Sequence, residues 1–203
     1  LGMALASARQ NTVGEKDKGI RSFLSAAGFT DFESEDYETE TSEETIATML
    51  GRRIVEGNTV LAVAVCGGNY QNEWQGNVLL SSKEYDEEIG EDNAFHAGFL
   101  TAATKVVKRV MNYLEKYPAQ GELRIWITGY SRAAAVANLA SFMLLYFNDR
   151  EADSRLYAYL FATPRCSAVV DIRDCPGVFN IVGGFDPVAV VPFGEWGYDR
   201  YGT

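Results

Sequence analysis

The sequence has little of what metal sites and disulfide scaffolds are built from. Its 203 residues include one histidine, His96, and three cysteines, Cys66, Cys166 and Cys175. They form no CxxC pair and no cluster with metal-ligand spacing, which argues against structural zinc. Cys166 and Cys175 are near enough in sequence to pair, but free buried thiols fit at least as well. We expect no metal and no cofactor.

Positive charge and long apolar runs are also scarce. The chain has 28 acidic and 18 basic side chains. The resulting net charge of -10 disfavours binding to nucleic acid or to an anionic membrane surface. No stretch reaches the roughly 18 apolar residues of a transmembrane helix, since Asn138 and Ser141 interrupt the longest candidate, residues 133–147. We therefore expect a soluble protein without stable membrane insertion. The oligomeric state is not indicated.

With 47% hydrophobic residues, the chain can form one full-sized core, and we predict a single domain over residues 1–203. Its N-terminal part, residues 1–56, reads as short helices separated by an acidic connection. Apolar residues over 20–27 recur at helical spacing, and Gly28 would end that helix. Eight carboxylates over residues 31–44 indicate a solvated acidic loop or a strand edge, because a calcium site would need a DxDxDG pattern. Residues 45–50 resemble a short amphipathic segment.

Residues 57–203 have the pattern of a sheet core. Buried strands are predicted over residues 59–65, 123–128, 156–162 and 179–183. Helices are predicted over residues 97–116, with Arg109 and three lysines outside the apolar stripe, and from Ala133 onward. This alternation predicts an α/β fold with a mostly parallel central sheet and helices on both faces.

The most informative stretch is LRIWITGYSRAAAVANLA, residues 123–140. A buried strand runs through Gly129 to Ala133 directly into an alanine-rich helix, which is the order of elements in a nucleophile elbow. Such a turn needs small residues on both sides of the nucleophile, and Gly129 and Ala133 are small. Ser131 is therefore the predicted nucleophile, at a helix amino end that favours a developing oxyanion. The alternative is a serine that only caps the helix.

A serine nucleophile needs an acid and a base. Asp186 follows the strand over residues 179–183, at the strand end where open α/β sheets build their sites, and is the predicted acid. The alternative is a turn residue before Pro187. The base should follow Asp186, but the one histidine, His96, precedes Ser131. We interpret His96 as a structural residue at the start of the helix over residues 97–116.

Several blocks together resemble the class 3 (fungal-type) lipase family of α/β-hydrolases, particularly its bacterial lipase-like members. The blocks are VAVCGG, AFHAGFL, GYSRA, FATPRC and NIVGGFDPVAVVP, and they lie between residues 58 and 192. Carried over by position, the resemblance makes Ser131 the nucleophile and Asp186 the acid. It places Gly68 where the family has an oxyanion serine or threonine, so that only a backbone N–H could serve there. The backbone N–H of Arg132 would be the second donor.

Residues 72–79 resemble the family's lid segment. Trp74 lies between polar residues and glycine, and with Tyr130 it is assigned to the lid or pocket, although a buried structural tryptophan fits Trp74 equally well. Arg165, after Pro164, is expected to anchor a neighbouring loop. The aromatic tail over residues 196–202 either borders the acyl pocket or packs on the core.

The resemblance implies a serine carboxylester hydrolase that acts on a small ester or an acylglycerol through an acyl-enzyme. In this family the histidine lies well beyond the acid, so we expect a fragment that lacks the C-terminal histidine segment and is truncated at both ends. Secretion or display on a bacterial cell is the expected localisation. The alternative function is a catalytically degenerate lipase-like module that binds an acyl chain, a glycan or a protein partner. Acyl transfer to an alcohol would use the same residues.

Overall fold

The computed structural model describes residues 1–10, 12–39, 45–66, 83–85, 94–147, 155–168, 175–187, 189–190, 194 and 197–203. Its helices are α1 (Gly2–Ala6), α2 (Lys18–Ala26), α4 (Ala97–Lys116) and α5 (Arg132–Phe147). A six-stranded sheet contains β1 (Thr30–Glu35), β2 (Thr48–Val55), β3 (Asn58–Val65), β6 (Leu123–Tyr130), β7 (Leu156–Phe161) and β9 (Val178–Ile181). A smaller sheet contains β4 (Lys83–Tyr85), β5 (Ala94–His96) and β8 (Ser167–Ala168).

The large sheet has the strand order β1-β2-β3-β6-β7-β9. Its first three strands pair antiparallel, and β3, β6, β7 and β9 pair parallel. This mixed, mostly parallel sheet confirms the predicted fold class. The carboxyl ends of the four parallel strands consequently lie along one edge, which we call the carboxyl edge.

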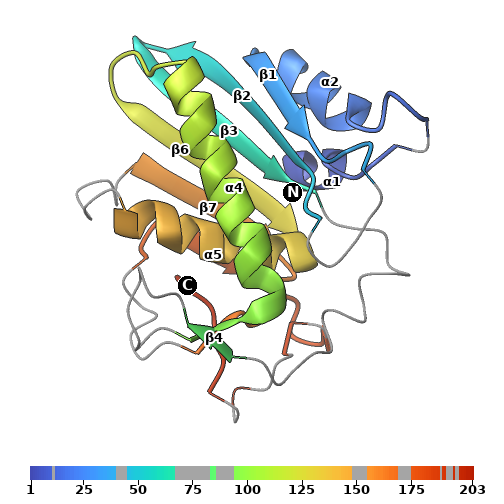
Figure 1. Cartoon of the computed structure of the whole chain (residues 1–203), viewed down its shortest axis with the longest axis vertical. Coiled ribbons are helices and arrows are strands. Elements are labelled where there is room, and N and C mark those ends of the chain that lie inside the picture. The colour runs from blue at the N-terminus through green and yellow to red at the C-terminus, as the bar shows by residue number, and fades with distance from the viewer. Residues whose placement is uncertain are drawn as a thin grey trace.

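Helices cover both faces of the sheet, as predicted (Figure 1). The central strand β3 shows why, since Leu61 to Val65 are wholly buried and alternate between two cores. Leu61, Val63 and Val65 join the core that includes α4 and α5, whereas Ala62 and Ala64 join the core that includes α1 and α2. A strand buried on both faces must be apolar at every position, which explains its continuous hydrophobic run.

The N-terminal part differs from the prediction. The expected helix over residues 20–27 is present as α2, but residues 30–35 and 48–55 form strands β1 and β2 of the main sheet. The amphipathic segment predicted over residues 45–50 is thus partly a strand. Because β1 lies at the edge of the sheet, its carboxylates can face solvent or cations, so an acidic composition is compatible with a strand. The strand-edge interpretation of the acidic run is confirmed for residues 31–35, whereas residues 40–44 lie outside the described residues.

The long helix over residues 97–116 is present as α4, with one correction. Arg109 was expected outside the apolar stripe, but its side chain is only 9% exposed and forms ion pairs with Glu35 and Asp36. The sequence pattern could not show this, because the partners lie more than 70 residues earlier in the chain. Among the helices within the described ranges, none has the length and apolarity needed to cross a membrane.

Candidate active site at the carboxyl edge

Ser131 forms a one-residue turn between β6 and α5. Its φ of 56° is left-handed, a conformation that a non-glycine residue adopts only where its surroundings impose it. The Ser131 N–H donates to the Phe161 carbonyl of β7 at 2.9 Å, and the Ser131 carbonyl accepts from the Ala134 N–H at 2.8 Å. The strand, tight turn and helix predicted for this segment are confirmed.

Gly129 is what allows β6 and α5 to approach each other so closely. A Cβ atom at this position would lie 2.4 Å from the carbonyl oxygen of Ala133, closer than any side chain tolerates. Ala133 itself is completely buried. The close packing of β6 and α5 therefore requires small residues on both sides of Ser131.

Asp186 lies at the same edge of the sheet as Ser131. Two backbone bonds connect the strand ends, since Ser131 N–H donates to Phe161 at the end of β7 and Ala162 N–H donates to Ile181 at the end of β9. Beyond β9 the chain turns, and the Asp186 N–H donates to the Gly183 carbonyl at 3.1 Å. Both Ser131 and Asp186 are half-buried. The structure thus brings the predicted nucleophile and acid to one edge, two strands apart.

Two arginines fasten the chain shortly after Asp186. Arg165 Nη1 donates to the Val190 carbonyl at 2.9 Å, which confirms its expected anchoring role. Arg200 donates through Nε to the Thr163 carbonyl at 2.8 Å and through Nη2 to the Ala189 carbonyl. The loop that carries Asp186 is therefore tied both to the end of β7 and to the C-terminal tail.

The aromatic tail packs on the core, one of its two predicted alternatives. Tyr201 is fully buried and stacks on Phe142 of α5 with a centroid distance of 4.0 Å. Asn138, also in α5, donates to the Tyr201 carbonyl at 2.9 Å and accepts from the Tyr201 N–H at 3.0 Å. In the sequence Asn138 interrupts an apolar run, and an amide in such a helix signals a buried polar contact.

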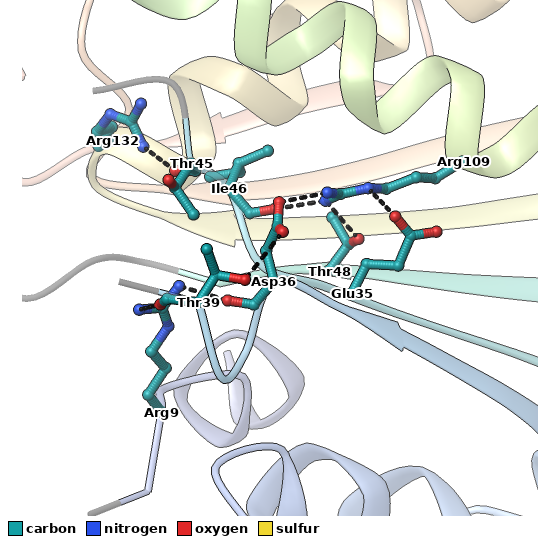
Figure 2. A network of polar contacts seen from close by, with 9 residues as sticks. All are labelled: Arg9, Glu35, Asp36, Thr39, Thr45, Ile46, Thr48, Arg109 and Arg132. Atoms are coloured by element: carbon teal, nitrogen blue, oxygen red, sulfur yellow. Dashed lines mark hydrogen bonds and ion pairs between the residues drawn. The ribbon is translucent and has the colours of Figure 1, made fainter. Parts of the chain in front are cut away.

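Arg132 and Tyr130 flank Ser131 in different environments. Arg132 opens α5, and its side chain is 5% exposed, with Nη1 donating to the Thr45 carbonyl at 3.2 Å (Figure 2). As the first residue of a helix, Arg132 has a backbone N–H in the turn whose amides lack intrahelical partners. Tyr130 ends β6 and is 37% exposed.

The structure describes three of the residues discussed in the sequence, Gly68, Trp74 and His96, only in part or not at all. Gly68 and Trp74 lie outside the described residues. For His96 only the backbone is described, and it ends β5, where it pairs with Lys83 directly before α4 begins. Two of the expected catalytic groups therefore lie at the carboxyl edge of the sheet, and the base remains a prediction.

The three cysteines are buried thiols that form no disulfide. Burial raises the pKa of the Cys166 thiol well above its usual range, so this group is not a nucleophile at neutral pH. In the described part of the chain, no three His, Cys, Asp or Glu side chains are grouped as a metal site would require.

Comparison with solved structures supports the fold assignment. The chain is similar to a mutant of MDLA from Penicillium cyclopium, with TM-score 0.68 and 19% identity over 97% of this chain and 73% of that one. It is similar to the Rhizomucor miehei lipase in its propeptide complex, with TM-score 0.67 and 17% identity over 97% and 63%. The lipase from Rhizopus microsporus var. chinensis gives TM-score 0.63 and 24% identity over 89% and 61%. This chain thus spans less than two thirds of two of these relatives.

These neighbours have the α/β-hydrolase fold, and at such low identity the likeness concerns the fold alone. No curated protein matches the chain in sequence. The profile of the Lipase (class 3) family matches residues 62–196, a range that includes β6, the turn at Ser131 and Asp186. The match covers about two thirds of the chain, and the chain therefore belongs to the class 3 lipase family.

Proposed function

We propose that this chain is the core of a serine carboxylester hydrolase with Ser131 as nucleophile and Asp186 as acid. The observation that carries the proposal is the left-handed one-residue turn at Ser131, between a buried strand and a helix. Holding a serine in this left-handed conformation costs conformational free energy. A serine that only caps a helix does not require that conformation. Membership of the class 3 lipase family supports the same assignment.

The reaction proceeds in two steps. Ser131 Oγ attacks the ester carbonyl, a histidine takes its proton, and the same histidine returns that proton to the departing alcohol. Water then attacks the acyl-enzyme carbonyl while the histidine takes its proton, and the histidine returns that proton to Ser131 Oγ as the carboxylic acid leaves. The backbone N–H groups of Arg132 and Gly68 are the proposed donors to the oxyanion. Asp186 orients the histidine and stabilises its charged form.

The proposed base is a histidine that follows Asp186 in the full-length protein. His96 is the one histidine in this sequence, and it precedes Ser131. The substrate is an ester or an acylglycerol, with Trp74 and Tyr130 beside the acyl group. We place the chain with the bacterial members of the family, as a soluble protein outside the cell.

A second function is a lipase-like module that binds an acyl chain, a glycan or a protein partner without turnover. The observation that favours it is Gly68, which stands where the family has a hydroxyl donor. Loss of one oxyanion donor costs about 3 kcal/mol in the transition state, so such a site would be weakened.

The test is labelling of the full-length protein with an organophosphonate ester, followed by mass spectrometry. An activated serine is modified stoichiometrically on Ser131, and esterase activity is lost in parallel. Ser131→Ala should remove labelling and lower kcat by about 10⁶-fold, with the thermal midpoint nearly unchanged. The matched control is Ser25→Ala, at an exposed position of α2, which should label like the wild type. Undiminished esterase activity in Ser131→Ala would refute the nucleophile, and an unlabelled active-site serine would favour the binding module.

A further inference from the structure

We propose that the side chain of Arg132 is a positioning element for its own backbone N–H, and that residues 45–47 provide the fixed point to which it is tied. The inference rests on the proposed function. We call residues 45–47 the 45–47 segment. It lies directly before β2, and Ile46 and Ala47 in it are buried.

Three successive carbonyls of the 45–47 segment accept hydrogen bonds from three different parts of the fold. The donors are Arg132 of α5 to Thr45 at 3.2 Å, Arg109 of α4 to Ile46, and the backbone N–H of Cys66, after β3, to Ala47 at 2.8 Å. Figure 2 shows both guanidinium groups converging on this segment from separate helices. The segment is therefore a common attachment point for the ends of β3 and β6 and for α4.

Arg109 makes this attachment point rigid. Its Nε forms an ion pair with Glu35 at 2.8 Å, Nη2 pairs with Asp36, and Nη1 donates to Thr48 Oγ1 at 3.0 Å as well as to the Ile46 carbonyl (Figure 2). A planar guanidinium with several partners cannot rotate without breaking most of these bonds together. The carbonyls of the 45–47 segment are consequently held in one orientation.

Arg9 fixes the same region from the opposite side. It donates to the Asp36 carbonyl at 2.7 Å and to the Thr39 carbonyl at 3.1 Å (Figure 2). Asp36 is thus held through its carboxylate by Arg109 and through its backbone by Arg9. Residues 36–39 are therefore restrained by α4 and by the residues after α1.

The tie from Arg132 to Thr45 acts on the residue next to the nucleophile. Ser131 is held in a strained conformation, and such strain persists only where neighbouring contacts oppose relaxation. Arg132 is joined through its buried side chain to a carbonyl 87 residues away. That bond resists rotation of the first turn of α5, in which the proposed oxyanion donor lies. The guanidinium points at a backbone carbonyl, so its role here is positioning.

A misplaced donor should weaken the transition state more than the ground state, because the oxyanion forms only during reaction. The expected signature is a lower kcat with KM unchanged. Displacement of a catalytic group by about 1 Å can cost about 100-fold in rate. We expect Arg132→Met to lower kcat by about 10- to 100-fold, and the rate of phosphonate labelling by a similar factor.

The experiment compares Arg132→Met, Arg132→Lys and a control in the full-length protein, measuring kcat, KM and phosphonate labelling with a soluble ester. The lysine variant keeps a cation that can donate to the Thr45 carbonyl. If Arg132→Met lowers kcat more than tenfold, the kcat of Arg132→Lys should be at least tenfold above that of Arg132→Met. If the loss is smaller, Arg132→Lys should restore most of the wild-type kcat. The control is Arg53→Met, an exposed arginine whose Nη1 donates to the Ala27 carbonyl at 2.8 Å. That bond is far from Ser131 in the fold, and kcat should stay within about twofold.

Two results would overturn the inference. One is a folded Arg132→Met with wild-type kcat, whether or not its KM rises, and the other is a lysine variant no better than methionine. Should Arg132→Met fail to fold, Arg132→Gln decides, since its amide is too short to replace the guanidinium at Thr45. Activity that survives Ser131→Ala refutes the proposed function instead, so the two failures are distinguishable.

Discussion

The parallel and antiparallel halves of the main sheet are stabilised by different interactions. In the parallel half, Leu61 to Val65 of β3 and Ile127 of β6 are completely buried, and apolar contacts hold the strands. In the antiparallel half, every second residue of β1 is acidic and paired with a cation. These pairs are Asp31 with Arg52 at 2.7 Å, Glu33 with Lys116 at 2.6 Å and Glu35 with Arg109 at 2.8 Å.

This difference shows that an acidic run can be structural. The carboxylates of β1 join the edge strand to β2 and to α4 through ion pairs, and Asp31 and Glu35 remain partly exposed to solvent as well. The parallel half leads into the tight turn at Ser131, and its stability depends on close steric packing. The antiparallel half is joined to the 45–47 segment, and its stability depends on ion pairs. The following variants test this division.

The largest effect is expected from Gly129→Ala in the parallel half. Its methyl group would meet the Ala133 carbonyl at 2.4 Å, so β6 and α5 must move apart. We expect a loss of about 3 kcal/mol in the free energy of unfolding, measured by urea denaturation, together with loss of phosphonate labelling. The control is Gly184→Ala, where no atom lies within 4 Å of the new Cβ, and the change should stay within about 0.5 kcal/mol. Equal stability of the two variants would contradict the steric argument.

In the antiparallel half, the largest effect is expected from Arg109→Met. The variant leaves the buried Ile46 carbonyl and Thr48 hydroxyl without their charged donor and separates Glu35 and Asp36 from their cation. We expect a loss of about 2 kcal/mol in urea denaturation, below the range for fully buried pairs because both carboxylates are partly exposed.

Lys116→Met on the same helix is the matched control for Arg109. Lys116 also pairs with a glutamate of β1, but its side chain is 63% exposed. Exposed pairs contribute less than about 1 kcal/mol, so this variant should change stability little. If both variants lost the same amount, burial would not be what distinguishes Arg109.

The smallest effect is expected from Asp31→Asn. The Arg52 guanidinium donates to the Asp31 carboxylate and lowers the pKa of that carboxyl in the folded protein. The pair thus stabilises the fold above the unfolded pKa of about 3.9, and this contribution is lost as the pH falls through the lower folded value. Because the pair is partly exposed, we expect about 0.5 kcal/mol at pH 7 and a smaller difference from wild type at pH 2.

Asparagine is a suitable replacement because Asp31 has φ 53°, a conformation that asparagine also tolerates. Urea denaturation at both pH values provides the measurement. Glu122→Gln, in an exposed pair with Arg124 at 3.5 Å, is the control and should show no such difference. A stability difference for Asp31→Asn that grows toward acid pH would have the wrong sign for this explanation.

The turn at Ser131 was predictable because every requirement is local. Gly129, Ser131 and Ala133 lie within five residues, and the strand and helix around them have clear patterns. Asp186 was predictable for a related reason, since parallel strands bring their carboxyl ends to one edge. The ion pairs of Arg109 were not predictable. The amphipathic pattern of α4 is the same whether or not a cation beside its apolar stripe has acidic partners elsewhere in the chain. Strand β1 was predicted only as one of two alternatives because acidic residues have low strand propensity, which the edge position and the ion pairs override.

The sequence by itself determined the alternation of strands and helices, the small residues around Ser131 and the placement of Asp186 after a strand. These features depend on sterics and periodicity over a few residues, which the order of amino acids fixes directly. Tertiary structure decided which cations meet the acidic residues of β1 and where the guanidinium of Arg132 binds. Those contacts join positions up to 87 residues apart, and only packing of the helices on the sheet brings such positions within hydrogen-bonding distance.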